Sequence, residues 1–283
     1  MTREPHWLLS HAANTYSQTG EDGIIAAILA LLPETDRWCV EFGAWDGVHL
    51  SNVRKLILEA QYHAVMIEAD PDKCRVLERN YAGNPRVHAI NAFVGFDRES
   101  SLDRLLSGCP IPRNFDFLSI DIDGNDYYAW EAVEQYRPKV VCIEFNPSIP
   151  SEVSFVQPAN PRLKQGCSVR ALQELAAATG YQLVCVLPWN AFFVDEKYFG
   201  LFGIADNSLH ALRRDLSHIT WLFSGYDGSI HLGGSRRLPW HECFFDERRM
   251  QVLPRLLRHF PGDYSRFQDR LFHWLVALGR IRR

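Results

Sequence analysis

The sequence lacks the features that identify disulfide-linked, exported or membrane-spanning proteins. Its seven cysteines are odd in number and scattered without a Cys-x-x-Cys pair, which favours a reducing compartment over a disulfide framework. The longest apolar run, Ile24 to Leu32, has nine residues, whereas a transmembrane helix needs roughly 20. The first residues, Met1 to His6, do not show the charged-then-apolar order of a signal peptide. We therefore expect a cytoplasmic protein with no transmembrane segment.

An excess of basic charge is also missing. The 283 residues include 30 basic and 34 acidic side chains, a formal charge of −4, whereas surfaces that follow phosphate backbones are basic. We therefore expect no nucleic-acid partner. Hydrophobic residues make up 47% and charged residues 23%, as in packed globular proteins. The length allows one large α/β domain, or a domain with a smaller appendage.

Short apolar runs alternate with helical patterns between residue 37 and about residue 195, which is typical of a parallel sheet built from strand-helix-strand units. The last two predicted strands are separated only by Pro188-Trp189-Asn190, too short for a parallel crossover, and should form an antiparallel hairpin. The sequence thus predicts an α/β fold with a Rossmann-like sheet of five parallel strands plus that hairpin. The predicted strands are Trp38–Phe42, His63–Glu68, Val87–Phe93, Phe115–Ile120, Lys139–Phe145, Tyr181–Leu187 and Ala191–Val194.

Three regions are predicted from changes in pattern along the chain. Residues 1–36 form a helical cap, residues 37–205 form the core, and residues 206–283 form an extension with a second hairpin, at Ile219–Phe223 and Ser229–Leu232. The proline-containing stretch from Asn146 to Cys167 is expected to be a substrate loop.

The extension ends in a predicted basic amphipathic helix, because apolar residues recur at helical spacing between Tyr264 and Ile281 with arginines between them. From Arg248 to Arg283 there are nine arginines and two aspartates. Such a helix usually docks on its own domain or on a twin subunit in a homo-oligomer. The alternative is peripheral contact with an anionic membrane surface.

Polar and glycine residues follow the first three predicted strands, where ligands bind in open parallel sheets. The first strand leads into the loop from Glu41 to Gly47, whose glycines allow close backbone approach to a ligand. The second ends at Glu68, 21 residues after Gly47, a spacing typical of a carboxylate that accepts both ribose hydroxyls. The third ends in the run from Asn91 to Val94, which is suited to an adenine. The pattern predicts an adenosine cofactor, against the alternative of an ordinary turn and a surface acid.

The missing motifs indicate which adenosine cofactor is bound. A nicotinamide or flavin site favours Gly-x-Gly-x-x-Gly, because a pyrophosphate needs an uncovered helix amino terminus. Position 45 is Trp, and the P-loop pattern is also absent. S-adenosyl-L-methionine, which has no phosphate, is therefore favoured. An NAD(P)-dependent oxidoreductase and a non-catalytic nucleotide-binding module remain alternatives.

Three motifs together resemble the FkbM-type branch of class I S-adenosylmethionine-dependent methyltransferases. They are the run from Ser17 to Asp22, the loop from Val40 to Gly47, and the run from Ser119 to Gly124, and the resemblance covers roughly residues 15 to 200. It implies an O-methyltransferase acting on a hydroxyl of a sugar, a glycan or a glycosylated natural product. The run from Asp123 to Asp126 departs from the family's more usual Glu-Gly dipeptide followed by a small residue. The predicted cofactor-binding residues are Gln18, Glu41, Gly43, Ala44, Asp46, Gly47, Glu68, Ala69, Asn91, Ala92, Phe93 and Asp121.

Methyl transfer to an alcohol needs a base or a metal ion for the alcohol proton. The predicted catalytic residues are Asp121, Asp123 and His49. Acids at the ends of neighbouring strands, about 4.8 Å apart, also favour a Mg²⁺ or Mn²⁺ site with Asp121, Glu144 and Asn146 as ligands. The alternative for the run from Asp123 to Asp126 is a tight turn and helix cap.

Two kinds of acceptor atom, oxygen and nitrogen, are open from the motifs alone. An N-methyltransferase remains an alternative, although the Asn-Pro-Pro-Tyr/Phe signature is missing after the fourth strand. Aromatic and amide side chains in residues 155–167 and at Trp189, Asn190, Trp240 and His241 are suited to stacking on a sugar and binding its hydroxyls.

Overall fold

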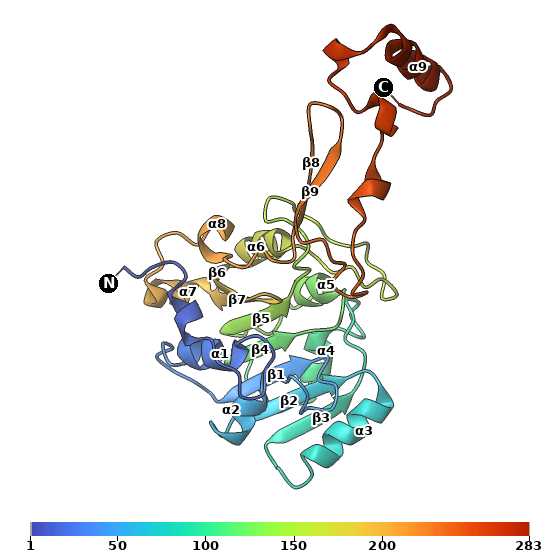
Figure 1. Ribbon diagram of the computed structural model, residues 1–283. Helices are drawn as coiled ribbons and strands as arrows, with labels where there is room; N and C mark the ends of the chain where they lie inside the picture. Colours follow the sequence, from blue (N-terminus) through green and yellow to red (C-terminus); the bar gives the residue numbers. More distant parts are fainter. Residues whose placement is uncertain (1, 283) are drawn as a thin grey trace. The chain divides into compact units, whose positions relative to one another are not determined.

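The computed structural model describes residues 2–282, which divide into two compact units, Met1–Asp215 and Leu216–Arg283. We call them unit 1 and unit 2 and describe each by itself (Figure 1). The three regions expected from the sequence, with boundaries at residues 36 and 205, stay a prediction.

Unit 1 is built on one seven-stranded sheet with the order β3-β2-β1-β4-β5-β7-β6 (Figure 1). Strands β1 to β5 pair in parallel, and β7 runs antiparallel to both β5 and β6. This confirms the predicted fold class of five parallel strands and an antiparallel hairpin. The strands are β1 (Trp38–Phe42), β2 (His63–Glu68), β3 (Val87–Asn91), β4 (Phe117–Ile120), β5 (Val140–Glu144), β6 (Tyr181–Val186) and β7 (Asn190–Asp195).

Apolar clusters cover both faces of the sheet, which explains why its central strands are apolar without alternation. One cluster includes Ile24, Ile25 and Ile28 of α1, and the other includes Leu172 and Leu175 of α6. The helices of unit 1 are η1 (Trp7–His11), α1 (Glu21–Leu29), α2 (Arg54–Leu58), α3 (Pro71–Asn80), α4 (Leu102–Leu106), α5 (Asp126–Glu131), α6 (Val169–Ala178), α7 (Glu196–Phe199), η2 (Gly200–Phe202) and α8 (Leu209–Leu212).

Several segments differ from the sequence-based expectation, among them the third strand, which ends at Asn91 instead of Phe93. The first 36 residues form the short helix η1 and then α1, because the run before Glu21 folds as a loop on the side chains of Glu21 and Asp22. The fourth strand begins at Phe117 instead of Phe115, since the pairing with β1 starts at Cys39 and Phe117.

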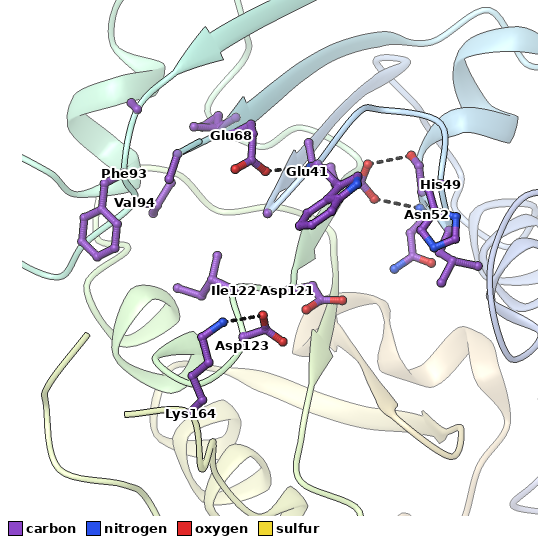
Figure 2. Close-up of a pocket in the computed structure, with 18 residues that line it drawn as sticks. Glu41, His49, Asn52, Glu68, Phe93, Val94, Asp121, Ile122, Asp123 and Lys164 are labelled. Atoms are coloured by element: carbon purple, nitrogen blue, oxygen red, sulfur yellow. Dashed lines mark hydrogen bonds and ion pairs between the residues drawn. The ribbon is translucent and has the colours of Figure 1, made fainter. Parts of the chain in front are cut away.

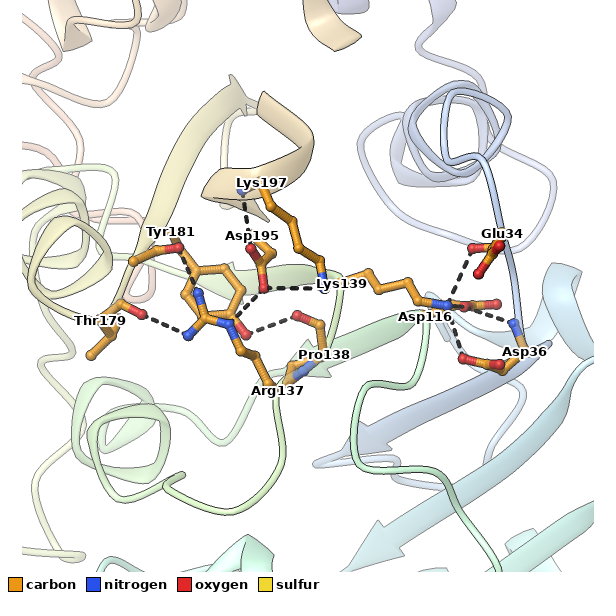
Figure 3. Close-up of polar contacts among 11 residues, drawn as sticks. Glu34, Asp36, Asp116, Arg137, Pro138, Lys139, Thr179, Tyr181, Asp195 and Lys197 are labelled. Carbon is orange, nitrogen blue, oxygen red and sulfur yellow. Dashed lines mark hydrogen bonds and ion pairs between the residues drawn. The ribbon is translucent and has the colours of Figure 1, made fainter. Parts of the chain in front are cut away.

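The amino ends of the strands are held together by buried ion pairs (Figure 3). Lys139, just before β5, donates to Asp116, just before β4, at 2.7 Å and to Asp36 at 2.8 Å. Asp116 also accepts backbone N–H groups from Asp36 and Arg37, before β1. Both Lys139 and Asp116 are buried. This network ties the starts of three central strands together.

Unit 2 contains a two-stranded antiparallel hairpin, β8 (Thr220–Ser224) with β9 (Ile230–Gly234), as the sequence predicted. The rest is short helices and α9 (Arg266–Ala277), which begins with a capping box between Ser265 and Gln268. The short helices are η3 (Glu247–Met250), η4 (Arg255–Leu257) and η5 (Pro261–Asp263). Within residues 2–282, no helix has the length and apolar character to cross a bilayer.

Candidate functional site

A cavity of about 400 Å³ opens at the carboxyl ends of β1, β2, β3 and β4 (Figure 2). Ten of the predicted site residues line it: Glu41, Gly43, Ala44, His49, Glu68, Ala69, Ala92, Phe93, Asp121 and Asp123. The segments that follow four separate strands therefore converge on one space.

Three of the other predicted residues support the cavity wall from behind. Asp46 accepts the backbone N–H groups of Val48 and His49. The carbonyl of Gly47 accepts from the Tyr81 hydroxyl. The side-chain amide of Asn91 donates to the carbonyls of Glu68 and Ala69. These contacts hold the loops that carry the lining residues.

Gln18, Glu144 and Asn146 also lie outside the cavity lining. The Gln18 side chain is exposed, and its backbone N–H donates to Glu21. The side-chain NH2 of Asn146 donates to the Gln165 carbonyl, and its side-chain oxygen accepts from the Ser148 hydroxyl. Glu144 lies beside Asp121 in the acidic cluster described below.

Eight lining residues were not among the predicted site residues: Trp45, Leu50, Ser51, Asn52, Ile67, Val94, Ile122 and Lys164. Trp45, Val94 and Ile122 belong to the motifs themselves and could have been included. Lys164 comes from the proline-containing segment after β5, and nothing in its own sequence context places it beside β4.

Gly43 allows β1 and the end of β4 to approach closely. A Cβ atom at Gly43 would lie 1.5 Å from the carbonyl oxygen of Asp121, and the backbone at Gly43 has φ +75°. No other residue fits there without moving the strand ends apart. The glycine in the loop thus sets the distance between the two strands whose ends carry Glu41 and Asp121.

The loop after β1 has already used most of its backbone donors. The N–H of Ala44 donates to the carbonyl of Ile67, and that of Trp45 to the Glu68 carboxylate at 2.7 Å. Gly47 donates to Ala44, and Val48 and His49 donate to Asp46. The next helix, α2, begins only at Arg54. This loop therefore does not form the open amide cradle at a helix start that a pyrophosphate requires.

Glu68 is buried and holds two loops while facing the cavity (Figure 2). One carboxylate oxygen accepts from Trp45 N, and the other accepts from Asp70 N at 2.8 Å. A carboxylate has about four acceptor positions, so each oxygen can still accept a hydroxyl from a ligand. Figure 2 shows Phe93 and Val94 on one side of Glu68 and the polar residues Glu41, His49 and Asn52 on the other. The cavity thus has an apolar end and an acidic end.

Three carboxylates form a tight acidic cluster where β4 and β5 end. Oxygens of Asp121, Asp123 and Glu144 all lie within 4.8 Å of one another. Loss of water around the carboxyl, together with the charges of Asp126 and Asp123, raises the pKa of Asp121 to about 8. Asp121 is exposed to the cavity, so water there screens these charges and limits the rise. Burial and the neighbouring Asp121 also raise the pKa of Glu144 well above its usual value.

Glu41 is buried beneath the cavity and belongs to a polar network. It accepts from the Ser51 hydroxyl at 2.6 Å and from Asn52 N at 2.7 Å, and the Asn52 amide donates to Ser119 on β4. Burial raises the pKa of Glu41 to about 7, despite these hydrogen bonds. No ion pair with Lys or Arg reaches Glu41, Asp121 or Glu144 among residues 2–282. The carboxyl end of the sheet is therefore acidic and short of compensating charge.

The motif from Ser17 to Asp22 folds as a loop at this edge of the sheet. Asp22 accepts the backbone N–H groups of Thr15, Tyr16 and Ser17. Glu21 accepts from Gln18 N and from the amide of Asn190. Asn190 pairs with Glu144 across β7 and β5. The two acids of this motif thus fix a loop next to the acidic cluster.

A second loop brings Lys164 to the cavity. The buried side chain of Gln157 accepts from Gln165 N and Gly166 N and donates to the Leu163 carbonyl. Gly124, with φ +139°, packs against this loop, where a Cβ atom would lie 2.7 Å from the Leu163 oxygen. Lys164 then pairs with Asp123 at 3.0 Å, with both side chains exposed (Figure 2).

No family model and no curated protein matches the chain. Among solved structures it is similar to an O-methyltransferase from Bacillus cereus in complex with SAH, at 18% identity over 66% of this chain and 85% of that one, with a TM-score of 0.44. A putative O-methyltransferase from Klebsiella pneumoniae matches at 16% identity over 65% and 83%, with a TM-score of 0.42. A SAM dependent methyltransferase from Aquifex aeolicus matches at 11% identity over 59% and 86%, with a TM-score of 0.36. Likenesses of this size leave the activity to be inferred from the cavity.

Proposed function

We propose that the chain is a class I S-adenosylmethionine-dependent methyltransferase that methylates a hydroxyl group. The observation that carries this proposal is the convergence of residues 43–45, 68–69, 92–94 and 121–123 on one cavity. Its volume of about 400 Å³ lies in the range of small-molecule sites. The FkbM-type assignment is part of the proposal and rests on the three sequence motifs.

The apolar end of the cavity suits an adenosine. Phe93, Val94 and Ile122 offer apolar surface for a flat base, and half of the Phe93 side chain is exposed. Glu68 lies next to this surface and keeps acceptor positions for two ribose hydroxyls. We therefore place the adenine beside Phe93 and the ribose at Glu68, where the base has an apolar surface and the hydroxyls have an acceptor.

The acidic end suits a cationic cofactor and disfavours a phosphate. Glu41, Glu68, Asp121 and Asp123 line the cavity with Lys164 and His49 as the basic side chains. S-adenosylmethionine carries a positive sulfonium and an ammonium group, which these carboxylates attract. A dinucleotide would place two negative phosphates there, beside a loop whose amides are already bonded. This is the reason to prefer a methyltransferase over an NAD(P)-dependent oxidoreductase.

The cofactor supplies a methyl group on a sulfonium, so that a neutral thioether leaves when the acceptor oxygen attacks the methyl carbon. We assign the general base to Asp121, which faces the cavity and takes the acceptor's hydroxyl proton as the new carbon–oxygen bond forms. A pKa near the working pH is what such a base needs, and the raised pKa of Asp121 meets that condition. His49, which also lines the cavity, is the alternative base (Figure 2).

A divalent cation is a second candidate for the same chemistry. The oxygens of Asp121, Asp123 and Glu144 lie close enough to share one ion, and oxygen ligands suit Mg²⁺ or Mn²⁺. Such an ion would offset the repulsion among the carboxylates and lower the pKa of a bound hydroxyl. Asn146, which the sequence also suggested as a ligand, stays in the proposal only as an outer neighbour, because its amide is bonded to Gln165 and Ser148.

For the acceptor we propose a sugar hydroxyl, on a glycan or a glycosylated natural product. Support comes from the motif resemblance and from the polar rim formed by His49, Asp123 and Lys164, which can bind several hydroxyls. An amine acceptor would depend less on a base than an alcohol does, so it predicts turnover that is reduced less by loss of Asp121.

Calorimetry tests the cofactor directly. The full chain should bind S-adenosylmethionine and S-adenosylhomocysteine and show no heat with NADH. Binding of NADH alone would overturn the proposal. Cofactor binding without methyl transfer to any sugar acceptor would instead support a non-catalytic nucleotide-binding module. Adding Mg²⁺ with and without a chelator separates the metal-dependent mechanism from the Asp121-only mechanism.

A further inference from the structure

The outward face of α9 in unit 2 is apolar and basic. Phe267, Trp274 and Leu278 are 65%, 58% and 55% exposed. They are spaced seven and four residues apart, which places them on one side of a helix. Arg266 and Arg270 lie beside this stripe along the same helix and are exposed.

The opposite side of α9 holds the helix to its own unit. Phe272 packs near Tyr264, with ring centroids 6.2 Å apart. The Gln268 amide donates to the Leu256 carbonyl at 2.9 Å. One face of the helix therefore packs on unit 2, and the stripe of Phe267, Trp274 and Leu278 on the other face stays exposed.

The charges beside the stripe are uncompensated. Within the described part of unit 2, Arg266 and Arg270 form no ion pair, whereas Glu242, Asp246 and Glu247 already pair with other arginines. Asp269 pairs with His273. Residues 216–283 contain eleven arginines, no lysine and six acidic residues. A partner for this face must therefore offer negative charge for the arginines and an apolar region into which the stripe can insert.

We propose that the outward face of α9 binds the surface of an anionic lipid bilayer. Arginine pairs with lipid phosphates through two parallel hydrogen bonds. Tryptophan and phenylalanine favour the boundary between headgroups and acyl chains. The aliphatic Leu278 has no role on a nucleic acid but inserts readily into lipid. This proposal stands independently of the methyltransferase activity.

A second copy of the chain fits this face less well. A two-fold contact through α9 would bring Arg266 and Arg270 of both copies together, and Asp246, Glu247 and Asp269 already pair within the unit. An anionic bilayer avoids this repulsion, because its negatively charged phosphates attract Arg266 and Arg270.

Flotation of the full chain with lipid vesicles tests the proposal. We expect binding to vesicles of phosphatidylcholine with phosphatidylglycerol, little binding to phosphatidylcholine alone, and weakening by added salt. Arg266→Glu with Arg270→Glu should weaken partitioning about tenfold or more, because each basic residue contributes substantially near a charged bilayer. Phe267→Ser with Trp274→Ser should also weaken it about tenfold or more, through lost apolar insertion.

The matched control is Arg98→Glu with Arg104→Glu, two exposed arginines of unit 1 that undergo the same change in charge. It should bind vesicles like the unchanged protein. Equal loss in this control, or no binding of the unchanged protein to phosphatidylglycerol, would overturn the proposal. Loss of self-association in the α9 variants, seen by light scattering without any vesicle effect, would assign the face to a second copy instead. Binding of a nucleic acid that competes with the vesicles would assign it to that partner.

Discussion

The two ends of the central sheet use the same kinds of residue in opposite ways. At the amino ends of the strands, Asp116 is buried against Lys139, and Asp195 is buried against Arg137 (Figure 3). At the carboxyl ends, Asp121 and Glu144 belong to one acidic cluster, and neither they nor the buried Glu41 form an ion pair to Lys or Arg in residues 2–282.

The paired acids at one edge have a structural role, and the unpaired acids at the other edge are suited to a chemical one. Removing one partner of a buried ion pair leaves the other charge unpaired and destabilises the fold strongly. Acids crowded without a base are instead driven toward their protonated forms, which weakens the fold but prepares groups that can bind cations or accept protons. The acids of one edge therefore stabilise the sheet, and those of the other edge are available to a ligand.

The largest effect that this comparison predicts is on turnover. Asp121→Asn removes the proposed base and should lower methyl transfer by roughly 10²- to 10⁴-fold, with the fold retained. Initial rates with a methylated-product assay would measure it, and calorimetry with S-adenosylhomocysteine would check binding. Rates near those of the unchanged protein would exclude Asp121 as the base.

At the opposite end, Lys139→Ala should lower the free energy of unfolding by about 3 to 5 kcal/mol, because it leaves Asp116 buried without its partner. Denaturant titration followed by circular dichroism would measure the loss. Lys164→Ala is the control, since its ion pair with Asp123 is exposed and should contribute less than about 1 kcal/mol. Similar losses in the two variants would contradict the distinction between the edges.

Loss of the Glu68 carboxylate should weaken cofactor binding. Glu68→Gln should weaken S-adenosylmethionine binding by about 1 to 3 kcal/mol, through the loss of charge-assisted hydrogen bonds. Glu78→Gln, on the exposed side of α3, should leave binding unchanged. Calorimetry on both variants decides whether Glu68 contacts the ligand.

The two edges should also lose stability in different ranges of pH. In the unfolded chain Asp121 and Glu41 have pKa values near 3.8 and 4.5, whereas burial raises the pKa of Glu41 to about 7 in the folded protein and raises that of Asp121 toward about 8, less the screening by water in the cavity. Between these values the folded state binds more protons, so stability falls as pH rises from about 4 to about 8. The pKa of Lys139 is raised, so its contribution is lost only above the ordinary lysine value of 10.5. Denaturant titrations at several pH values would measure this. In the double variant Asp121→Asn with Glu41→Gln, the fall in the free energy of unfolding between about pH 4 and pH 8 should be smaller. An unchanged slope would remove these acids as its cause.

Much of the fold was predictable because it depends on short-range pattern. The bounds of β1 and β2 match the predicted strands, and the brief link at Pro188-Trp189-Asn190 was enough to require an antiparallel hairpin. Residues that directly follow strands, such as Gly43, Glu68, Phe93 and Asp121, were predicted to gather because parallel strands end at one edge.

The sequence by itself determined how many short apolar strands the chain forms and which polar residues follow them. These features depend on the hydrophobic pattern of neighbouring residues, which can be read without the tertiary structure. Only the tertiary structure decided that Lys164 meets Asp123, that Asn52 reaches Ser119, and that α9 turns Phe267 and Trp274 outward. Those contacts join segments up to 67 residues apart, and their positions depend on packing that no local pattern records.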